Sequence, residues 1–208
     1  MNSKTVSRLL WGLLAFSLFT VTGLAAWSWL APKKEPLPVI GTVPAFTFTE
    51  RSGRPAGLDD LRGHVWIADF IFTSCAGTCP VMTTHMTELQ TALEQEGLED
   101  VRLASFSVDP ETDTPEVLTR FANGYGASPE KWLFFSGPAK EMQELATKGF
   151  LLAAVANGGT GEEAIIHSNR FVLVDRQGRI RKYYVGTETG IAALILQDVK
   201  MLLAEKSH

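Results

Sequence analysis

Cysteine is the residue this chain has least of for its size. Only two occur in 208 residues, Cys75 and Cys79, so a single disulfide is the most that the chain can form internally. Three residues separate them, in the stretch FIFTSCAGTCPVMTTHM at residues 70–86. A pair this close can be a stabilising clamp, a redox-active dithiol or part of a metal site, and spacing alone does not choose among the three.

An excess of positive charge is also missing. The chain has 19 Lys and Arg against 23 Asp and Glu, a net charge of −4 and a pI near 5.6. No stripe of Lys and Arg interrupts this balance, which excludes the usual electrostatic footprint of a nucleic-acid-binding protein. Charged residues make up 20% and hydrophobic residues 45% of the chain, as in an ordinary globular domain with one buried core.

Residues 9–31, LLWGLLAFSLFTVTGLAAWSWLA, contain no charged side chain at all. As a helix rising about 1.5 Å per residue, the run would span roughly 35 Å, enough to cross the hydrocarbon core of a bilayer. Trp27 and Trp29 suit the interfacial belt near its end. We expect a transmembrane signal anchor over 9–31, preceded by a short segment, 1–8.

Two other interpretations of this run stay open, a cleaved signal peptide and a buried core helix. A cleaved signal peptide normally has an apolar region of about 7 to 15 residues, followed by a small-residue cleavage site.

The orientation of the predicted anchor follows from its flanks. Basic residues flank both ends of the run, and the free amino terminus favours the inside for the N-terminal end. The remainder of the chain then faces the periplasm of a bacterial inner membrane, where a cysteine pair can be oxidised.

Residues 32–42, with the sequence PKKEPLP at 32–38, have the composition of a semi-extended linker. One domain then follows over 43–208. A hairpin with a turn at Ser52–Gly53 leads into an apolar strand at 64–72, and later strands alternate with amphipathic helices. The helices are expected at 80–97, 115–123, 138–148 and 191–205. This order predicts an α/β fold with a mixed central sheet and helices on both faces.

The cysteines fall where such a fold places chemistry. Cys75 follows a central strand at its carboxyl end, the usual position of active sites in open α/β sheets. Pro80 suits the first turn of a helix, so Cys79 lies at or just before a helix start, where the dipole and free N–H groups favour a thiolate. A disulfide here closes too short a loop to remove much chain entropy, so a stabilising clamp explains the pair poorly.

A metal held by two thiolates needs at least one further ligand, and the chain has four histidines. His208 is the last residue, and His64 and His85 are expected to be ordinary surface residues. His167 stands in IIHSNRFVLVD at the entrance to a strand, after the glycine-containing segment 156–161 that could fold over the cysteine loop.

Three separated motifs, FIFTSCAGTCP, SVDPETDTPEVL and IIHSNRFVLVDRQGRI, occur together in this chain. In this order they resemble the Sco/SenC family of thioredoxin-like copper proteins, which are needed to assemble cytochrome c oxidase. The resemblance runs from about Val43 to the C-terminus and includes the single N-terminal anchor. Thioredoxins and peroxiredoxins match in fold only, because their cysteine motifs are spaced differently.

The resemblance implies that Cys75, Cys79 and His167 together bind one copper ion. Soft thiolates with imidazole suit Cu(I), and Cu(II) with an added weak ligand, while zinc stays chemically possible. Asp109 and Asp113 match the DxxxD element of the family, and the sequence Asp113-Thr-Pro-Glu is explained equally well as a helix cap.

Two methionines are possible additional ligands, and one position near His167 differs from many relatives. Met82 and Met86 could offer thioethers, but their helical spacing favours core packing. Ile166 stands where many relatives carry an Asp, which puts in doubt a supporting role for a carboxylate there.

The function implied is a membrane-anchored metallochaperone, with no classical enzyme activity, that delivers copper to the dinuclear centre of an oxidase. Its expected partners are the copper-bearing subunit of cytochrome c oxidase and an upstream periplasmic copper donor. The alternative is a thiol-disulfide oxidoreductase that reduces the cysteines of the oxidase copper site through Cys75 and Cys79. A scaffold without chemistry is the third possibility.

Overall fold

The computed structural model describes residues 11–23, 35–152 and 169–205. The chain forms two compact units, residues 1–35 and 36–208. In the first unit, residues 11–23 are helical. Within the described residues, no helix is both long and apolar enough to cross a membrane. The predicted span 9–31 extends on both sides of this helix into residues that lie outside the described part of the chain.

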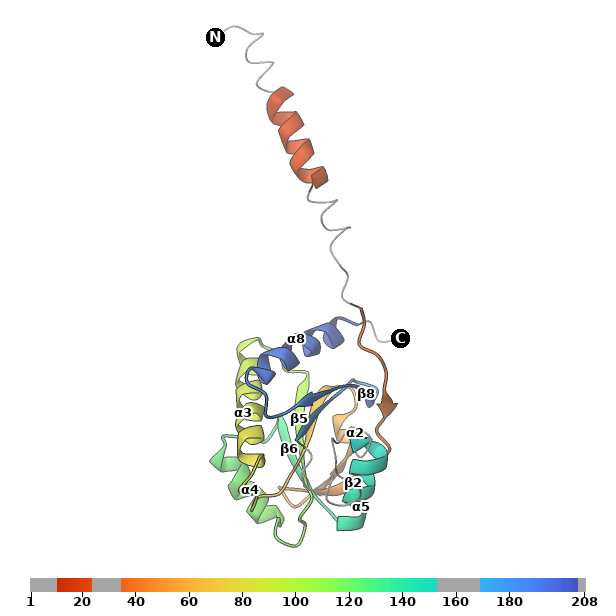
Figure 1. The fold of residues 1–208 in the computed structure, drawn as a ribbon, viewed down its shortest axis with the longest axis vertical. Coiled ribbons are helices and arrows are strands. Elements are labelled where there is room, and N and C mark those ends of the chain that lie inside the picture. Colours follow the sequence, from red (N-terminus) through yellow and green to blue (C-terminus); the bar gives the residue numbers. More distant parts are fainter. Residues whose placement is uncertain (1–10, 24–34, 153–168, 206–208) are drawn as a thin grey trace. The chain divides into compact units, whose positions relative to one another are not determined.

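Among the residues that the structure describes, the second unit contains a mixed sheet of eight strands in the order β1-β8-β7-β4-β5-β6-β2-β3 (Figure 1). The strands are β1 (Gly41–Thr42), β2 (Thr47–Glu50), β3 (Pro55–Gly57), β4 (Val65–Ile71), β5 (Val101–Ser107), β6 (Trp132–Ser136), β7 (Arg170–Val174) and β8 (Arg179–Val185). The three central strands β4, β5 and β6 run parallel, and every other pairing is antiparallel. The predicted mixed sheet and the hairpin before β4 are confirmed.

The sheet begins within the predicted linker 32–42. Strand β1 pairs with β8, and Arg181 of β8 donates hydrogen bonds to the carbonyl oxygens of Leu37 and Pro38. These contacts tie the start of the second unit to the β7–β8 hairpin.

Helices cover both faces of the sheet, with α3 and α4 on one side and α2 and α5 on the other (Figure 1). The helices are α2 (Leu58–Leu61), α3 (Cys79–Gln95), α4 (Pro115–Gly124), α5 (Ala139–Glu144), the π-helical turn η1 (Leu145–Gly149) and α8 (Ile191–Ala204). The predicted helix 138–148 is therefore two elements, since its second half widens into a π-helical turn.

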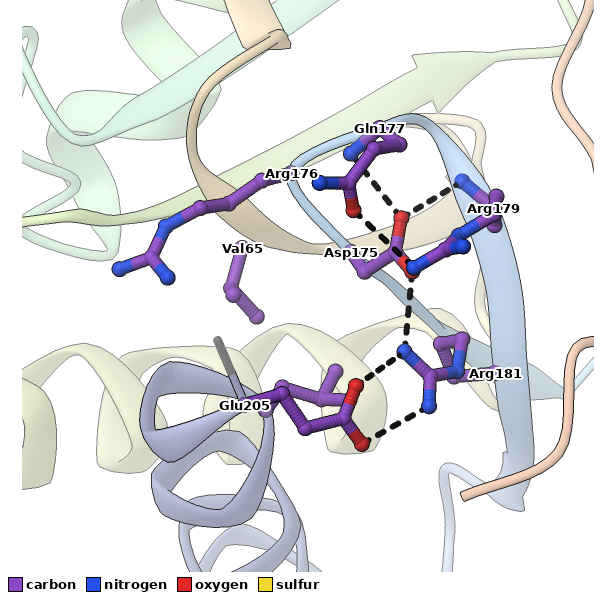
Figure 2. A pocket seen from close by; sticks show the side chains of 8 residues that line it. Val65, Asp175, Arg176, Gln177, Arg179, Arg181 and Glu205 are labelled. Carbon is purple, nitrogen blue, oxygen red and sulfur yellow. Dashed lines mark hydrogen bonds and ion pairs between the residues drawn. The ribbon is translucent and has the colours of Figure 1, made fainter. Parts of the chain in front are cut away.

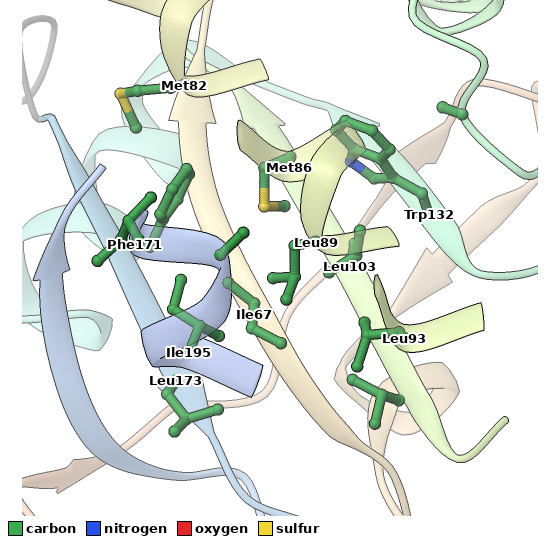
Figure 3. Close-up of a cluster of buried hydrophobic side chains, with 14 of the residues drawn as sticks. Ile67, Met82, Met86, Leu89, Leu93, Leu103, Trp132, Phe171, Leu173 and Ile195 are labelled. Carbon is green, nitrogen blue, oxygen red and sulfur yellow. The ribbon is translucent and has the colours of Figure 1, made fainter. Parts of the chain in front are cut away.

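Strand β4 is buried along its whole length and alternates between two cores. Val65, Ile67 and Ile71 pack with α3, α4 and α8, as Figure 3 shows for part of this cluster, whereas Trp66 and Phe70 pack with the residues of α2, α5 and η1. A strand with apolar side chains on both faces belongs in the middle of a sheet covered on both sides. The loop that follows β4 thus leaves the sheet from a strand that is buried at every position.

The two methionines of α3 are fully buried in the first of these cores, so the prediction that they pack rather than ligate is confirmed. Both Met82 and Met86 are 0% exposed. In Figure 3, Met86 lies near Leu89 and Met82 near Phe171.

Candidate metal centre

Cys75 and Cys79 lie at the carboxyl end of β4, as the strand pattern predicts. Strands β4 and β5 run in parallel register from Val65 and Val101 to Ile71 and Ser107, so both end at this edge of the sheet. Residues 72–78, which we call the cysteine loop, connect β4 to α3. Cys75 is half-buried in this loop, Cys79 is the first residue of α3 and is buried, and both are free thiols.

The surroundings of Cys75 favour its thiolate. Partial burial opposes ionisation, but hydrogen bonds from the Cys79 thiol and from the backbone N–H groups of Cys79, Gly77 and Thr78 outweigh it and lower the pKa of Cys75. The N–H group of Gly77 lies 3.4 Å from the Cys75 sulfur. Cys75 is therefore an accessible, readily ionised sulfur, as a nucleophile or a metal ligand must be.

Cys79 behaves in the opposite way. Burial, the interaction with Cys75 and the nearby Asp69 together raise the pKa of Cys79 to about 12. Burial thus opposes the thiolate that the helix start was expected to favour at this residue. The pair thus consists of one half-buried thiol with a lowered pKa and one buried thiol with a raised pKa.

Asp69 is a buried acid that the sequence analysis missed. It is 0% exposed two residues before the end of β4, and burial, only partly offset by the Ser105 hydroxyl, raises the pKa of Asp69 to about 7. Ser105 donates to the Asp69 Oδ1 at 2.6 Å and accepts from Trp132 Nε1. The Asp69 Oδ2 has no hydrogen-bond partner among the described residues. The signal was available, because an aspartate inside the apolar run VWIADFIF is unusual.

Asp113 is also fully buried, and its role differs from the predicted one. The residue that caps α4 is Thr114, whose hydroxyl accepts from the N–H of Val117. The Asp113 carboxylate instead accepts hydrogen bonds from the backbone N–H and hydroxyl of Thr73 and from the hydroxyl of Ser107. The helix-cap interpretation of Asp113 is wrong, because its carboxylate is turned toward the cysteine loop.

Asp109 differs from Asp113 in its surroundings. It is partly buried, and its carboxylate accepts a long hydrogen bond of 3.4 Å from the N–H of Thr112. Of the two acids in the DxxxD element, only Asp113 has a hydrogen bond to the cysteine loop within the described residues.

The four histidines divide into two described and two undescribed residues. His64 and His85 are partly buried instead of fully exposed, and His85 Nδ1 lies 2.7 Å from the carbonyl oxygen of Gly186. His85 thereby links α3 to the turn after β8. His167, the segment 156–161 and His208 lie outside the described residues.

Within the described residues, no group of three His, Cys, Asp or Glu side chains gathers in a way that could hold a metal ion. What the described part contributes is a pair of sulfurs, one of them accessible. Two thiolates are soft donors that suit Cu(I) or zinc. A third donor for such an ion has to come from another part of the chain, from solvent or from a partner.

A second polar cluster lies at the other end of the sheet, around a cavity of about 20 Å³ (Figure 2). Arg181 donates to Asp175 at 2.9 Å and to Glu205 at 2.8 Å, and Arg179 donates to Asp175 at 2.7 Å. The cavity has room for about one water molecule, and the two carboxylates that line it already pair with Arg179 and Arg181. We regard it as a structural cluster.

The family described as SCO1/SenC matches residues 37–204 of this chain. The chain belongs to this family. The SCO1 protein homolog of Bacillus subtilis is 44% identical over 159 residues, which cover 76% of this chain and 81% of that protein.

Two solved structures illustrate the likeness within the family. BsSco, described as a Sco-family cytochrome c oxidase assembly protein with a disulfide switch, is 39% identical with a TM-score of 0.69, over 83% of this chain and 100% of that one. ScoI of Bradyrhizobium japonicum, solved with copper bound, is 21% identical with a TM-score of 0.62, over 77% and 99% of the two chains. The first shares the mixed α/β fold at substantial identity, and the second shows the fold alone.

Proposed function

We propose that this protein is a membrane-anchored copper carrier that holds one copper ion through Cys75, Cys79 and His167. The observation that carries the proposal is the placement of the only two cysteines at the carboxyl end of β4, one in the cysteine loop and one at the first residue of α3. Membership of the SCO1/SenC family supports copper as the cargo, as the family resemblance implies.

The two sulfurs have different roles in copper binding. Cys75, half-buried and with a lowered pKa, is the sulfur that an incoming copper ion meets first. Cys79 is protonated at neutral pH, so binding through both sulfurs releases a proton and becomes tighter as pH rises. Two thiolates and the imidazole of His167 make a soft donor set that suits Cu(I).

Delivery to the dinuclear copper centre of cytochrome c oxidase is the second part of the proposal. Residues 9–31 would span a bacterial inner membrane and hold the domain at its periplasmic face. The partners are then the copper-bearing oxidase subunit and a periplasmic copper donor. BsSco, described as an oxidase assembly protein, is the relative that supports this role.

The test is an anaerobic titration of the reduced full chain, in detergent, with Cu(I) against a competing chelator. The wild-type chain should bind one Cu(I) tightly. In His167→Ala the affinity for Cu(I) should fall by at least about 100-fold, because the ion loses one of its three ligands. His208→Ala is the matched control and should bind like the wild type. A His167→Ala chain that binds as tightly as the wild type would overturn the ligand set.

The asymmetry of the thiols favours one second candidate, a thiol-disulfide oxidoreductase. The Cys75 thiolate would attack a target disulfide and release one target thiolate, and Cys79, once deprotonated, would attack the Cys75 sulfur and release the other. The target gains two electrons and this chain ends as a disulfide. Weak copper binding that is indifferent to His167, together with reduction of an oxidase-subunit disulfide, would favour this candidate.

A further inference from the structure

Asp113 joins two parts of the chain that are 40 residues apart. Its carboxylate accepts a hydrogen bond from the N–H of Thr73 at 3.1 Å and another from the Thr73 hydroxyl at 2.5 Å. The hydroxyl of Ser107, the last residue of β5, donates at 2.5 Å to Oδ2, the oxygen that also accepts from the Thr73 N–H. The carboxylate is 0% exposed, so it cannot replace these donors with water if they are lost.

Thr73 stands at the start of the cysteine loop. It lies two residues after the end of β4 and two residues before Cys75, whose own N–H donates to the carbonyl oxygen of Phe72. The bonds to Asp113 therefore fix the backbone at the point where the chain leaves the sheet and turns toward Cys75.

The other end of the loop is fixed by different means. Cys79 is buried in the core beneath α3, and its carbonyl oxygen accepts from the Thr83 hydroxyl at 2.8 Å. Between the two ends, Ala76, Gly77 and Thr78 are exposed. The separation of the two sulfurs thus depends on one anchor in the helix and one anchor at Asp113.

We propose that Asp113 is a positioning residue that acts through Thr73 to hold Cys75 at bonding distance from Cys79. A disulfide requires the two Cα atoms to lie within a narrow range of about 4.4 to 6.8 Å, and a shared metal ion imposes a similar limit. Fixing the loop before either bond forms removes part of its ordering cost. The role in disulfide formation stands on the loop geometry, while the role in copper binding rests on the proposed function.

The test is the equilibrium of the full chain in detergent with glutathione, followed by alkylation and mass measurement. In this reaction the protein dithiol and oxidised glutathione give the protein disulfide and two reduced glutathiones. Thr73→Val keeps the backbone N–H and the side-chain volume but removes the hydroxyl, and Asp113→Asn removes the charge. We expect each to lower the equilibrium constant for disulfide formation by roughly 3- to 10-fold, about the net contribution of one ordinary hydrogen bond.

The double variant separates positioning from general stability. If Asp113 acts through Thr73, the two substitutions together should shift the equilibrium little more than either alone. Glu116→Gln is the matched control, since it removes an exposed carboxylate near the start of α4 and should leave the equilibrium unchanged. Folded Thr73→Val and Asp113→Asn chains that both keep the wild-type equilibrium constant would overturn the proposal, as would a shift toward the disulfide.

A Cu(I) titration of the same variants keeps the two proposals apart. A wild-type chain that fails to bind copper, with the glutathione shifts present, would end the copper function and leave the positioning role standing. Tight copper binding with no glutathione shift would do the reverse.

Discussion

The two ends of the central sheet differ in the partners of their buried acidic side chains. At the end where β4 begins, Arg181 is paired with Asp175 and Glu205, so each charge has an opposite charge within 3 Å (Figure 2). At the end where β4 finishes, the donors to Asp69 and Asp113 are neutral hydroxyl and amide groups.

The difference separates a structural end from a chemical end. A buried ion pair is costly to break but gives little chemistry, because its charges already satisfy one another. Buried acids with neutral donors are costly to keep ionised, and they cluster where pKa values are shifted for function. The thiol pair lies at this second end, with one pKa lowered and the other raised. Buried acids whose hydrogen-bond donors are neutral therefore lie at the same end of the sheet as the cysteine loop.

The largest effect is expected at the structural end. Arg181→Met removes the one cation shared by Asp175 and Glu205 and also the donors to the Leu37 and Pro38 carbonyls. Breaking a buried pair in this way lowers the free energy of unfolding by about 3 to 5 kcal/mol. Urea denaturation of the full chain measures the loss.

Arg179→Met is the matched control for this variant, because Arg179 binds the same Asp175 but its side chain is 40% exposed. An exposed pair contributes about 0 to 1 kcal/mol. Equal losses in the two variants would mean that burial does not distinguish the two arginines and would weaken the comparison of the two ends.

The next effect has the opposite sign and lies at the chemical end. Folding raises the pKa of Asp69 from 3.8 to about 7, so the folded chain holds this proton more tightly than the unfolded chain does. The stability that the neutral acid contributes is complete below about pH 4 and is lost as pH rises toward 7. Asp69→Asn stays neutral and should unfold with a free energy about 2 to 4 kcal/mol higher than the wild type at pH 8.

Measuring the unfolding free energy from pH 4 to pH 8 checks both the size and the sign. The advantage of Asp69→Asn should vanish at pH 4. Asp59→Asn, whose side chain is 89% exposed, serves as the control and should show no such pH dependence. A variant that is less stable than the wild type at pH 8 would show that the Asp69 carboxylate is stabilising in its ionised form.

The sequence predicted the fold well because the fold follows periodic patterns. Alternating Phe46 and Phe48, the apolar run of β4 and the helical spacing of Met82 and Met86 all report which faces are buried. The π-helical turn η1 was missed, because a widened turn keeps the same apolar side chains as an α-helix.

The site was predicted less completely because its properties depend on burial and long-range contacts. The spacing of Cys75 and Cys79 located the loop, but the burial that raises the pKa of Cys79 is a tertiary property. The hydrogen bonds from Thr73 to Asp113 join residues 40 positions apart, so no local sequence pattern predicts them. The local pattern favoured Asp113 as the N-cap of α4, whereas the N-cap in the structure is the next residue, Thr114.

The smallest expected effect tests this last distinction. Thr114→Ala removes the hydroxyl that caps α4, which accepts from the Val117 N–H and donates to Glu116. Loss of an N-cap lowers the free energy of unfolding by about 0.5 to 1 kcal/mol, here near the low end because the bond to Val117 is long at 3.4 Å. The glutathione equilibrium should stay at the wild-type value, because among the described residues Thr114 has no hydrogen bond to the cysteine loop. Urea denaturation and the glutathione equilibrium on the same sample check both halves. A shift in the equilibrium as large as that of Asp113→Asn would mean that the start of α4 as a whole, and not the Asp113 carboxylate, positions the loop.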